Sequence, residues 1–150
     1  MLAVQRSGRI LLATMLFGLS ACEGSTGPTG PTGPFLLCAQ VSTISRGETK
    51  NGTLSTSDCN MGDGSYVDFY RFTLSSAATV TITMRSSSID SYLFLYSEAQ
   101  MMLDSDDDSG FGVSGTDSQI VFPLSAGNYV IAANSFAAGE TGSYTVSLVY

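Results

Sequence analysis

Closely spaced carboxylates are the strongest candidates for chemistry in this sequence. Asp104, Asp106 and Asp108 occupy alternate positions in the segment 104–110. Carboxylate oxygens at this spacing suit Ca²⁺, a hard cation that prefers oxygen ligands. An acid-rich hairpin turn would give the same pattern, because Asp side chains accept hydrogen bonds from nearby backbone N–H groups. The sequence leaves both interpretations open.

The segment also resembles the opening of an EF-hand loop. Its glycine stands one position late, and Gly115 occupies the position of the bidentate Glu. A complete EF-hand loop is therefore excluded, and calcium binding would need a less regular set of ligands. No cofactor is required by anything else in the sequence.

Hydrolytic chemistry would have to rest on the same carboxylates. The chain has no His, which removes Ser–His and Cys–His catalysis and most zinc sites. Asp90 paired with one of the acids of 104–108 could act as general acid and base, as in glycosidases. However, the chain has no Trp to form a sugar platform. We therefore expect no enzymatic activity, and a carboxylate-based hydrolase is the least favoured alternative.

Aromatic side chains form a second group of candidates. Tyr92, Phe94 and Tyr96 alternate with two leucines, so inward leucines would place the three rings on the opposite face. Exposed aromatic rows are typical of recognition surfaces, although the rings could instead pack under a loop or tail. Phe111 and Phe136 stand in Gly-rich loops as either plugs or ligand anchors.

Cys22 ends the stretch Leu19-Ser20-Ala21-Cys22, which follows an apolar run and two arginines near the start of the chain. This order resembles the lipobox of bacterial lipoprotein signals. In that family the thiol is diacylglycerylated, the peptide is cut before the cysteine, and the new amino terminus is acylated, for example with palmitate. The resemblance implies a signal peptide at 1–21 and a membrane anchor on Cys22.

Two alternatives to this anchor remain. An ordinary cleaved secretory signal would share the same layout, whereas a retained helix would need about 20 apolar residues and the run has roughly half. Acylation would hold the protein to a bilayer on the extracytoplasmic side. Glu23 follows the cysteine, where Asp would favour inner-membrane retention in the enteric sorting rule, so the outer membrane is favoured if the host has two membranes.

Lipidation of Cys22 would leave Cys38 and Cys59 as an even pair in an oxidising compartment. We expect a disulfide, which would stabilise the fold by about 3 kcal/mol in the chain-entropy model. Two separate buried thiols are the alternative.

Charge and composition separate a tether from a domain. Removal of residues 1–21 leaves four basic residues against thirteen acidic ones, a net charge of −9, which would repel nucleic acid and anionic lipid. Residues 22–34 are rich in Gly, Pro and Thr and cannot form a core, so they predict an extended tether. Residues 35–150 are enough for one domain.

Short alternating runs after residue 35 predict an all-β domain. The expected strands lie at 37–41, 67–74, 79–84, 93–95, 101–103, 120–124, 129–133 and 144–148, with a turn at 126–128. About eight strands suit an antiparallel β-sandwich of jelly-roll type, with its core built from one face of each strand. Asn51-Gly-Thr53 fits a glycosylation acceptor, but we interpret it as a turn.

Five segments in order resemble the bacterial pre-peptidase C-terminal domain, over about 38–150. They are Asp68-Phe-Tyr70-Arg-Phe72, Asp90-Ser-Tyr-Leu93-Phe-Leu95-Tyr96, Asp106-Asp107-Asp108-Ser-Gly110, Leu124-Ser-Ala-Gly127-Asn-Tyr129-Val-Ile131 and Gly142-Ser-Tyr144-Thr-Val146. The resemblance implies a jelly-roll β-sandwich, a fold usually attached to secreted proteases and related to collagen-binding domains of collagenases. It also brings Asp90 beside the acidic turn as a further calcium ligand.

No protease precedes this domain in the sequence, so we expect the module to act alone or with a partner. The expected function is a non-enzymatic, lipid-anchored module that presents an acidic, aromatic surface to an extracytoplasmic protein or polysaccharide. The alternative is a structural envelope or secretion accessory that works through strand edges and has no discrete ligand site.

Overall fold

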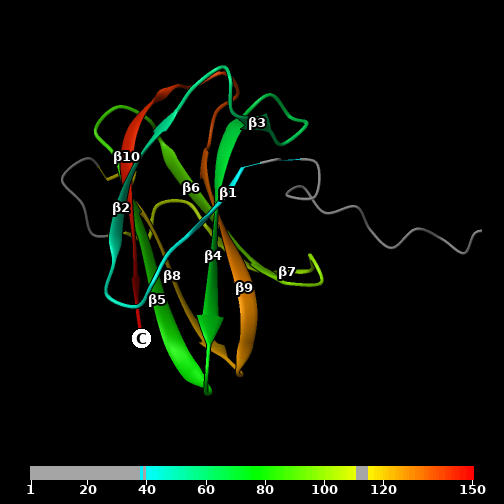
Figure 1. Ribbon diagram of the computed structural model, residues 1–150. Helices are drawn as coiled ribbons and strands as arrows, with labels where there is room; N and C mark the ends of the chain where they lie inside the picture. Colours follow the sequence, from blue (N-terminus) through cyan, green and yellow to red (C-terminus); the bar gives the residue numbers. More distant parts are fainter. Residues whose placement is uncertain (1–37, 39, 111–114) are drawn as a thin grey trace, which may run out of the picture.

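Two β-sheets face each other in the computed structural model, which describes residue 38 and residues 40–110 and 115–150 (Figure 1). Sheet A has the order β1-β4-β9-β6-β7, with β3 also paired to β4. Its strands are β1 (Val41–Thr43), β3 (Cys59–Asn60), β4 (Tyr66–Leu74), β6 (Ser91–Ser97), β7 (Met102–Asp106) and β9 (Gly127–Ser135). Sheet B has the order β2-β10-β5-β8. Its strands are β2 (Thr49–Leu54), β5 (Ala78–Arg85), β8 (Ser118–Leu124) and β10 (Gly142–Val149).

The predicted all-β sandwich is confirmed, with differences in its details. The described residues form ten strands where about eight were expected, and β1 pairs with β4 in parallel. The interpretation of Asn51-Gly-Thr53 as a turn was wrong, because these residues lie in β2 and pair with β10. The turn expected at 126–128 is shorter, since β9 already begins at Gly127.

The chain passes from one sheet to the other at most connections. Within the described residues, the β3–β4 and β6–β7 connections are the exceptions that join neighbours in one sheet. Strands that follow one another in sequence therefore usually lie in opposite layers. Functional residues close in sequence are brought together mainly by the β6–β7 hairpin.

The main core lies between the two sheets. Alternating positions of each long strand point inward, as expected for Tyr70, Phe72 and Leu74 on β4. Val80, Ile82 and Met84 do the same on β5. Burial of such side chains is the principal stabilising contribution to a fold of this size.

A second apolar cluster covers the outer face of sheet A, which the sequence analysis did not predict. Val67 and Phe69 of β4 lie there with Val130 and Ala132 of β9, and all four are buried. The expectation that only one face of each strand is buried is therefore wrong for β4 and β9.

The predicted disulfide joins Cys38 to Cys59, with their Cα atoms 5.8 Å apart. It connects the segment before β1 to β3, and these two short strands pair with β4 at neighbouring positions. Both cysteines pack against the second apolar cluster. The disulfide thus fastens the cover over part of the outer face of sheet A.

The predicted signal peptide at 1–21 and tether at 22–34, including Cys22, lie outside the described residues. Among the residues that the structure describes, none forms a helix long and apolar enough to span a membrane.

Candidate functional site

An acidic cluster forms at one end of the β6–β7 hairpin. Asp90 immediately precedes β6, and Asp107 and Asp108 immediately follow β7. The antiparallel register, which pairs Leu93 with Asp106, brings these ends together. One carboxylate oxygen from each of the three acids lies within 4.8 Å of the others. Three oxygens at this separation could ligate one hard divalent cation.

The composition of this cluster differs from the sequence prediction. Asp90 and Asp108 meet as expected, but Asp107 takes the place assigned to Asp104 and Asp106. Asp104 accepts a hydrogen bond from the N–H of Ser105 at 3.0 Å. Asp104 and Asp106 belong to β7, whereas Asp107 and Asp108 lie in the turn that follows it, next to Asp90.

Asp106 is occupied by hydrogen bonds that stabilise the turn and the edge of sheet B. Its Oδ2 accepts the N–H of Gln119 of β8 at 2.7 Å and the N–H of Ser109 at 3.1 Å. The Ser109 hydroxyl donates to its Oδ1. For Asp106, the prediction of a turn whose Asp side chains accept backbone hydrogen bonds describes the geometry better than the prediction of a metal ligand.

Like charges make the acidic cluster electrostatically unfavourable. Burial raises the pKa of Asp90, and the charges of Asp108 and Glu140 raise it further. Burial, Asp108 and Asp90 similarly raise the pKa of Asp107. Asp90 Oδ1, Asp107 Oδ1 and Glu140 Oε2 are buried with no hydrogen-bond partner among the described residues. A bound cation would offset this repulsion.

Beside the acidic cluster, aromatic rings line the outer face of sheet A. The aromatic surface consists of Tyr92, Phe94, Tyr96 and Phe136. The ring centroids of Tyr92 and Phe94 are 4.7 Å apart, those of Phe94 and Tyr96 are 6.0 Å apart, and those of Tyr92 and Phe136 are 6.2 Å apart. These separations are typical of interacting aromatic pairs.

The rings differ sharply in exposure. Tyr96 is only 6% exposed and belongs to the second apolar cluster on the outer face of sheet A, so of the two predicted alternatives it is a covered ring and not an exposed one. Tyr92 and Phe94 are half-buried, whereas Phe136 is 60% exposed. Met102 pairs with Tyr96 across the hairpin and is 59% exposed. The aromatic surface is thus buried at Tyr96 and accessible at Phe136.

Phe136 is held in place by its backbone. Its N–H donates to the carbonyl of Asp90 at 2.9 Å, immediately after β9 ends at Ser135. The Ser135 hydroxyl donates to the carbonyl of Ala137 at 3.0 Å. These contacts fix the most exposed ring of the aromatic surface next to the acidic cluster. At 60% exposure Phe136 is not a loop plug, and the other predicted alternative, a ligand anchor, stays a prediction. Phe111 lies outside the described residues.

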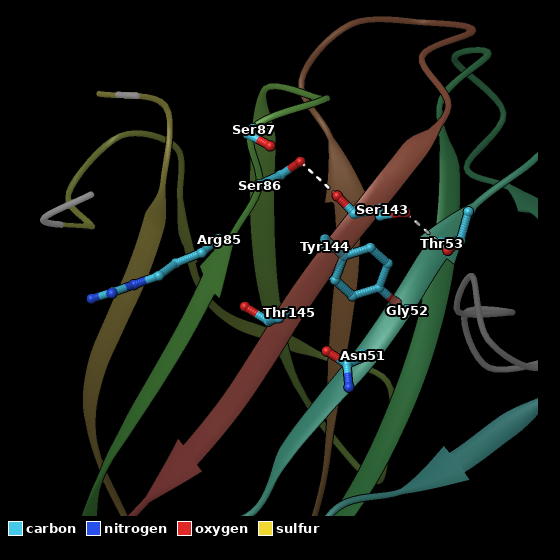
Figure 2. Close-up of a pocket in the computed structure, with 9 residues that line it drawn as sticks. All are labelled: Asn51, Gly52, Thr53, Arg85, Ser86, Ser87, Ser143, Tyr144 and Thr145. Carbon is cyan, nitrogen blue, oxygen red and sulfur yellow. Dashed lines mark hydrogen bonds between the residues drawn. The ribbon is translucent and has the colours of Figure 1, made fainter. Parts of the chain in front are cut away.

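Sheet B carries a different feature, a broad polar hollow of about 530 Å³ over β2, β10 and β5 (Figure 2). Its lining residues are mostly hydroxyl and amide side chains: Asn51, Gly52, Thr53, Arg85, Ser86, Ser87, Ser143, Tyr144 and Thr145. No sequence motif indicated this hollow, because its residues come from three strands that are distant in the sequence.

A buried polar chain lies under the hollow, on the inner side of sheet B. Tyr144 donates a hydrogen bond to Asp68 Oδ2 at 2.5 Å, and its hydroxyl lies 2.7 Å from the hydroxyl of Tyr70. Burial raises the pKa of Asp68, and the charge of Asp58 adds to this effect. Gly52 leaves room for the Tyr144 ring, since a Cβ at that position would lie 2.2 Å from a ring carbon.

Residues 66–135 match the family model of the bacterial pre-peptidase C-terminal domain. This segment holds β4 to β9, including the acidic cluster and three rings of the aromatic surface, and it ends one residue before Phe136. The match covers somewhat less than half of the chain, so it shows a similarity to that family. The family model thus agrees with the resemblance found in the sequence over residues 66–135, and domains of that family are non-catalytic accessory domains.

Two solved structures are similar to this chain. The pre-peptidase C-terminal domain of a collagenase from Bacillus anthracis is 20% identical, with a TM-score of 0.58, and the match covers 73% of this chain and 94% of that one. PliG from Aeromonas hydrophila, a periplasmic inhibitor of g-type lysozyme, is 15% identical, with a TM-score of 0.45. This match covers 73% of this chain and 97% of that one. No curated protein matches the chain in sequence. At 20% identity, the likeness to the collagenase domain shows the fold alone.

Proposed function

We propose that this protein is a lipid-anchored, non-enzymatic binding module that recognises an extracytoplasmic protein or polysaccharide through the aromatic surface. The observation that carries the proposal is the exposed ring of Phe136, fixed by its backbone and stacked on Tyr92. Rigid aromatic anchors of this kind contribute strongly to binding because little conformational entropy is lost.

Several strand edges are poorly suited to the addition of a partner strand, so they favour recognition through a sheet face. On sheet B, the N–H of Gln119 at the outer edge of β8 is already bonded to Asp106, and Pro123 stands further along the same strand. On sheet A, the edge of β4 is covered by the short strands β1 and β3. Short, capped or Pro-containing edges disfavour the addition of a partner strand. The structural accessory remains the alternative.

Capture from detergent-solubilised envelope of the host tests the aromatic surface. The bait is the full-length protein, compared with Tyr92→Ala combined with Phe136→Ala. Val121→Ala, which removes an exposed apolar side chain from sheet B, is the matched control. The proposal predicts that the double variant loses a partner that the wild type and the control retain. Unchanged capture by the double variant would reject the aromatic surface and favour the edges.

The anchor on Cys22 is proposed from the lipobox resemblance in the sequence. The intact mass of the protein extracted from its native membrane without reductant tests it. The expected mass begins at Cys22, carries acyl chains and lacks the two hydrogens of the Cys38–Cys59 disulfide. A mass without lipid would reject the anchor and direct the search for partners to soluble ligands.

A further inference from the structure

The outer face of sheet B differs from the rest of this acidic protein in having no carboxylate. Not one Asp or Glu occurs in its four strands, β2, β5, β8 and β10, although the chain has thirteen. Most inward positions of these strands are apolar, so most of the polar side chains stand at outward positions. These outward residues are mainly Thr and Ser: Thr49, Thr53, Thr79, Thr81, Thr83, Ser143, Thr145 and Ser147.

The polar hollow is the part of this face where free hydrogen-bonding groups converge. In the portion of the chain that the structure describes, the side chains of Asn51, Ser87 and Thr145 make no hydrogen bond. Figure 2 shows them on β2, at the end of β5 and on β10, so they surround the same space. Amide and hydroxyl groups both donate and accept hydrogen bonds, as sugar hydroxyls do.

Neighbouring contacts hold the rim of the hollow rigid. The Ser86 hydroxyl donates to the carbonyl of Ser143 at 2.7 Å and accepts the N–H groups of Ser88 and Ile89. Thr53 and Ser143 bring their hydroxyls within 3.4 Å of each other. A rigid set of polar groups loses little entropy when a ligand binds.

The one charged side chain at the hollow does not place its charge inside it. Arg85 Nε lies 3.8 Å from the buried carboxylate of Asp117, and in Figure 2 the guanidinium points away from the other labelled side chains. The net charge of the protein, −7, would also repel a polyanion. The electrostatics therefore favour an uncharged ligand.

We infer that the polar hollow of sheet B binds a neutral polysaccharide chain, through hydrogen bonds from Asn51, Ser87 and Thr145 to sugar hydroxyls. The hollow is broad and open and lies on a sheet face, which suits a segment of a linear polymer. It lies on the opposite sheet from the aromatic surface, so the inference goes beyond the proposed function and can fail without it.

Backbone amide shifts of the full-length protein in detergent, titrated with cellohexaose, xylohexaose and chitohexaose, test the inference. We expect at least one of these neutral hexasaccharides to shift the amides of β2, β10 and the end of β5. Thr145→Val, which removes a hydroxyl and keeps the side-chain shape, should weaken that binding at least tenfold. Thr79→Val is the matched control on the same face, about 20 Å along β5.

Several results would overturn the inference. They are the absence of shifts with all three sugars, binding of hexagalacturonic acid in their place, and equal affinity of Thr145→Val and the wild type. Binding that is lost in Tyr92→Ala but kept in Thr145→Val would assign the sugar to the aromatic surface, so it would reject the hollow while supporting the proposed function.

Discussion

The two outer faces of the sandwich show how similar strands can present opposite chemistry. The outer face of sheet A carries apolar and aromatic side chains, among them Phe69, Val130 and Phe94, and is partly covered by the disulfide-linked segment. The outer face of sheet B carries mainly Thr, Ser and amide side chains, and its strands contain no Asp or Glu. An apolar face must be covered or bind a partner, whereas a hydroxyl face can remain in water.

The difference underlies the two proposals, which give each face a different task. The apolar face of sheet A continues from a covered part, near Cys38 and Cys59, to an accessible part at Phe136. Its accessible part is suited to a partner with apolar groups. The face of sheet B offers directional hydrogen bonds, which suit a hydrated polymer. The predictions below test how far the faces differ in stability and in ligands.

Loss of the disulfide should have the largest effect, because it fastens the cover of sheet A. Cys38→Ser combined with Cys59→Ser should lower the free energy of unfolding by about 3 kcal/mol. Thermal unfolding measures the loss, and hydrogen exchange should increase in β4 and β9 more than in β5 and β10. An equal increase in both sheets would contradict a local cover.

Gly52→Ala should have the next largest effect, and it acts on sheet B. The added Cβ would overlap the Tyr144 ring and displace its hydrogen bonds to Asp68 and Tyr70. Overpacking of this kind costs roughly 1–3 kcal/mol. Chemical denaturation measures it, and Asn51→Ala, whose side chain points outward from the same strand, should remain within about 0.5 kcal/mol of the wild type.

Calcium should stabilise only the end of sheet A that carries the acidic cluster. If Asp90, Asp107 and Asp108 bind the ion, calcium at ten times its Kd should raise the free energy of unfolding by about 1.4 kcal/mol. Asp107→Asn with Asp108→Asn should abolish the increase, and Asp104→Asn should preserve it. A melting temperature that does not respond to calcium would remove the site.

The carboxyl of Asp68 should give the smallest effect, a dependence of stability on pH. Its pKa is raised in the folded state, so folding favours the protonated form, and this stabilisation is lost as the pH rises through the folded-state pKa. Asp68→Asn should flatten this part of the profile and stabilise the protein at pH 7 by roughly 0.5 kcal/mol. Parallel pH profiles of the two proteins would contradict the assignment.

Sequence periodicity was sufficient to predict which residues lie on the inner faces of the long strands. Tyr70, Val80 and Leu93 alternate with polar or outward residues, and each lies in the main core as predicted. Periodicity could not find the second cluster, because β9 contains a continuous apolar run from Tyr129 to Ala133 with no alternation to interpret. It also missed β2, where the Asn-Gly pair is typical of a turn.

The candidate sites were predictable only where hairpin register connects them. Asp90 and Asp108 could be brought together from the sequence. The sequence does not reveal that Asp107 joins them while Asp106 bonds to β8, because this depends on the direction of each side chain at the end of the hairpin. Glu140 and the hollow of sheet B depend on segments that are distant in the sequence. Their proximity follows from packing between strands, which a single sequence does not reveal.

Photocrosslinking in intact host cells tests most directly the claim that the outer face of sheet A is the partner surface. Benzoylphenylalanine replaces Phe136 in one variant and Val121 of sheet B in the other, two apolar residues that are 60% and 56% exposed. The account predicts a discrete crosslinked protein or glycan adduct from position 136 and none of the same mass from position 121. The same adduct from both positions, or an adduct from position 121 alone, would contradict it.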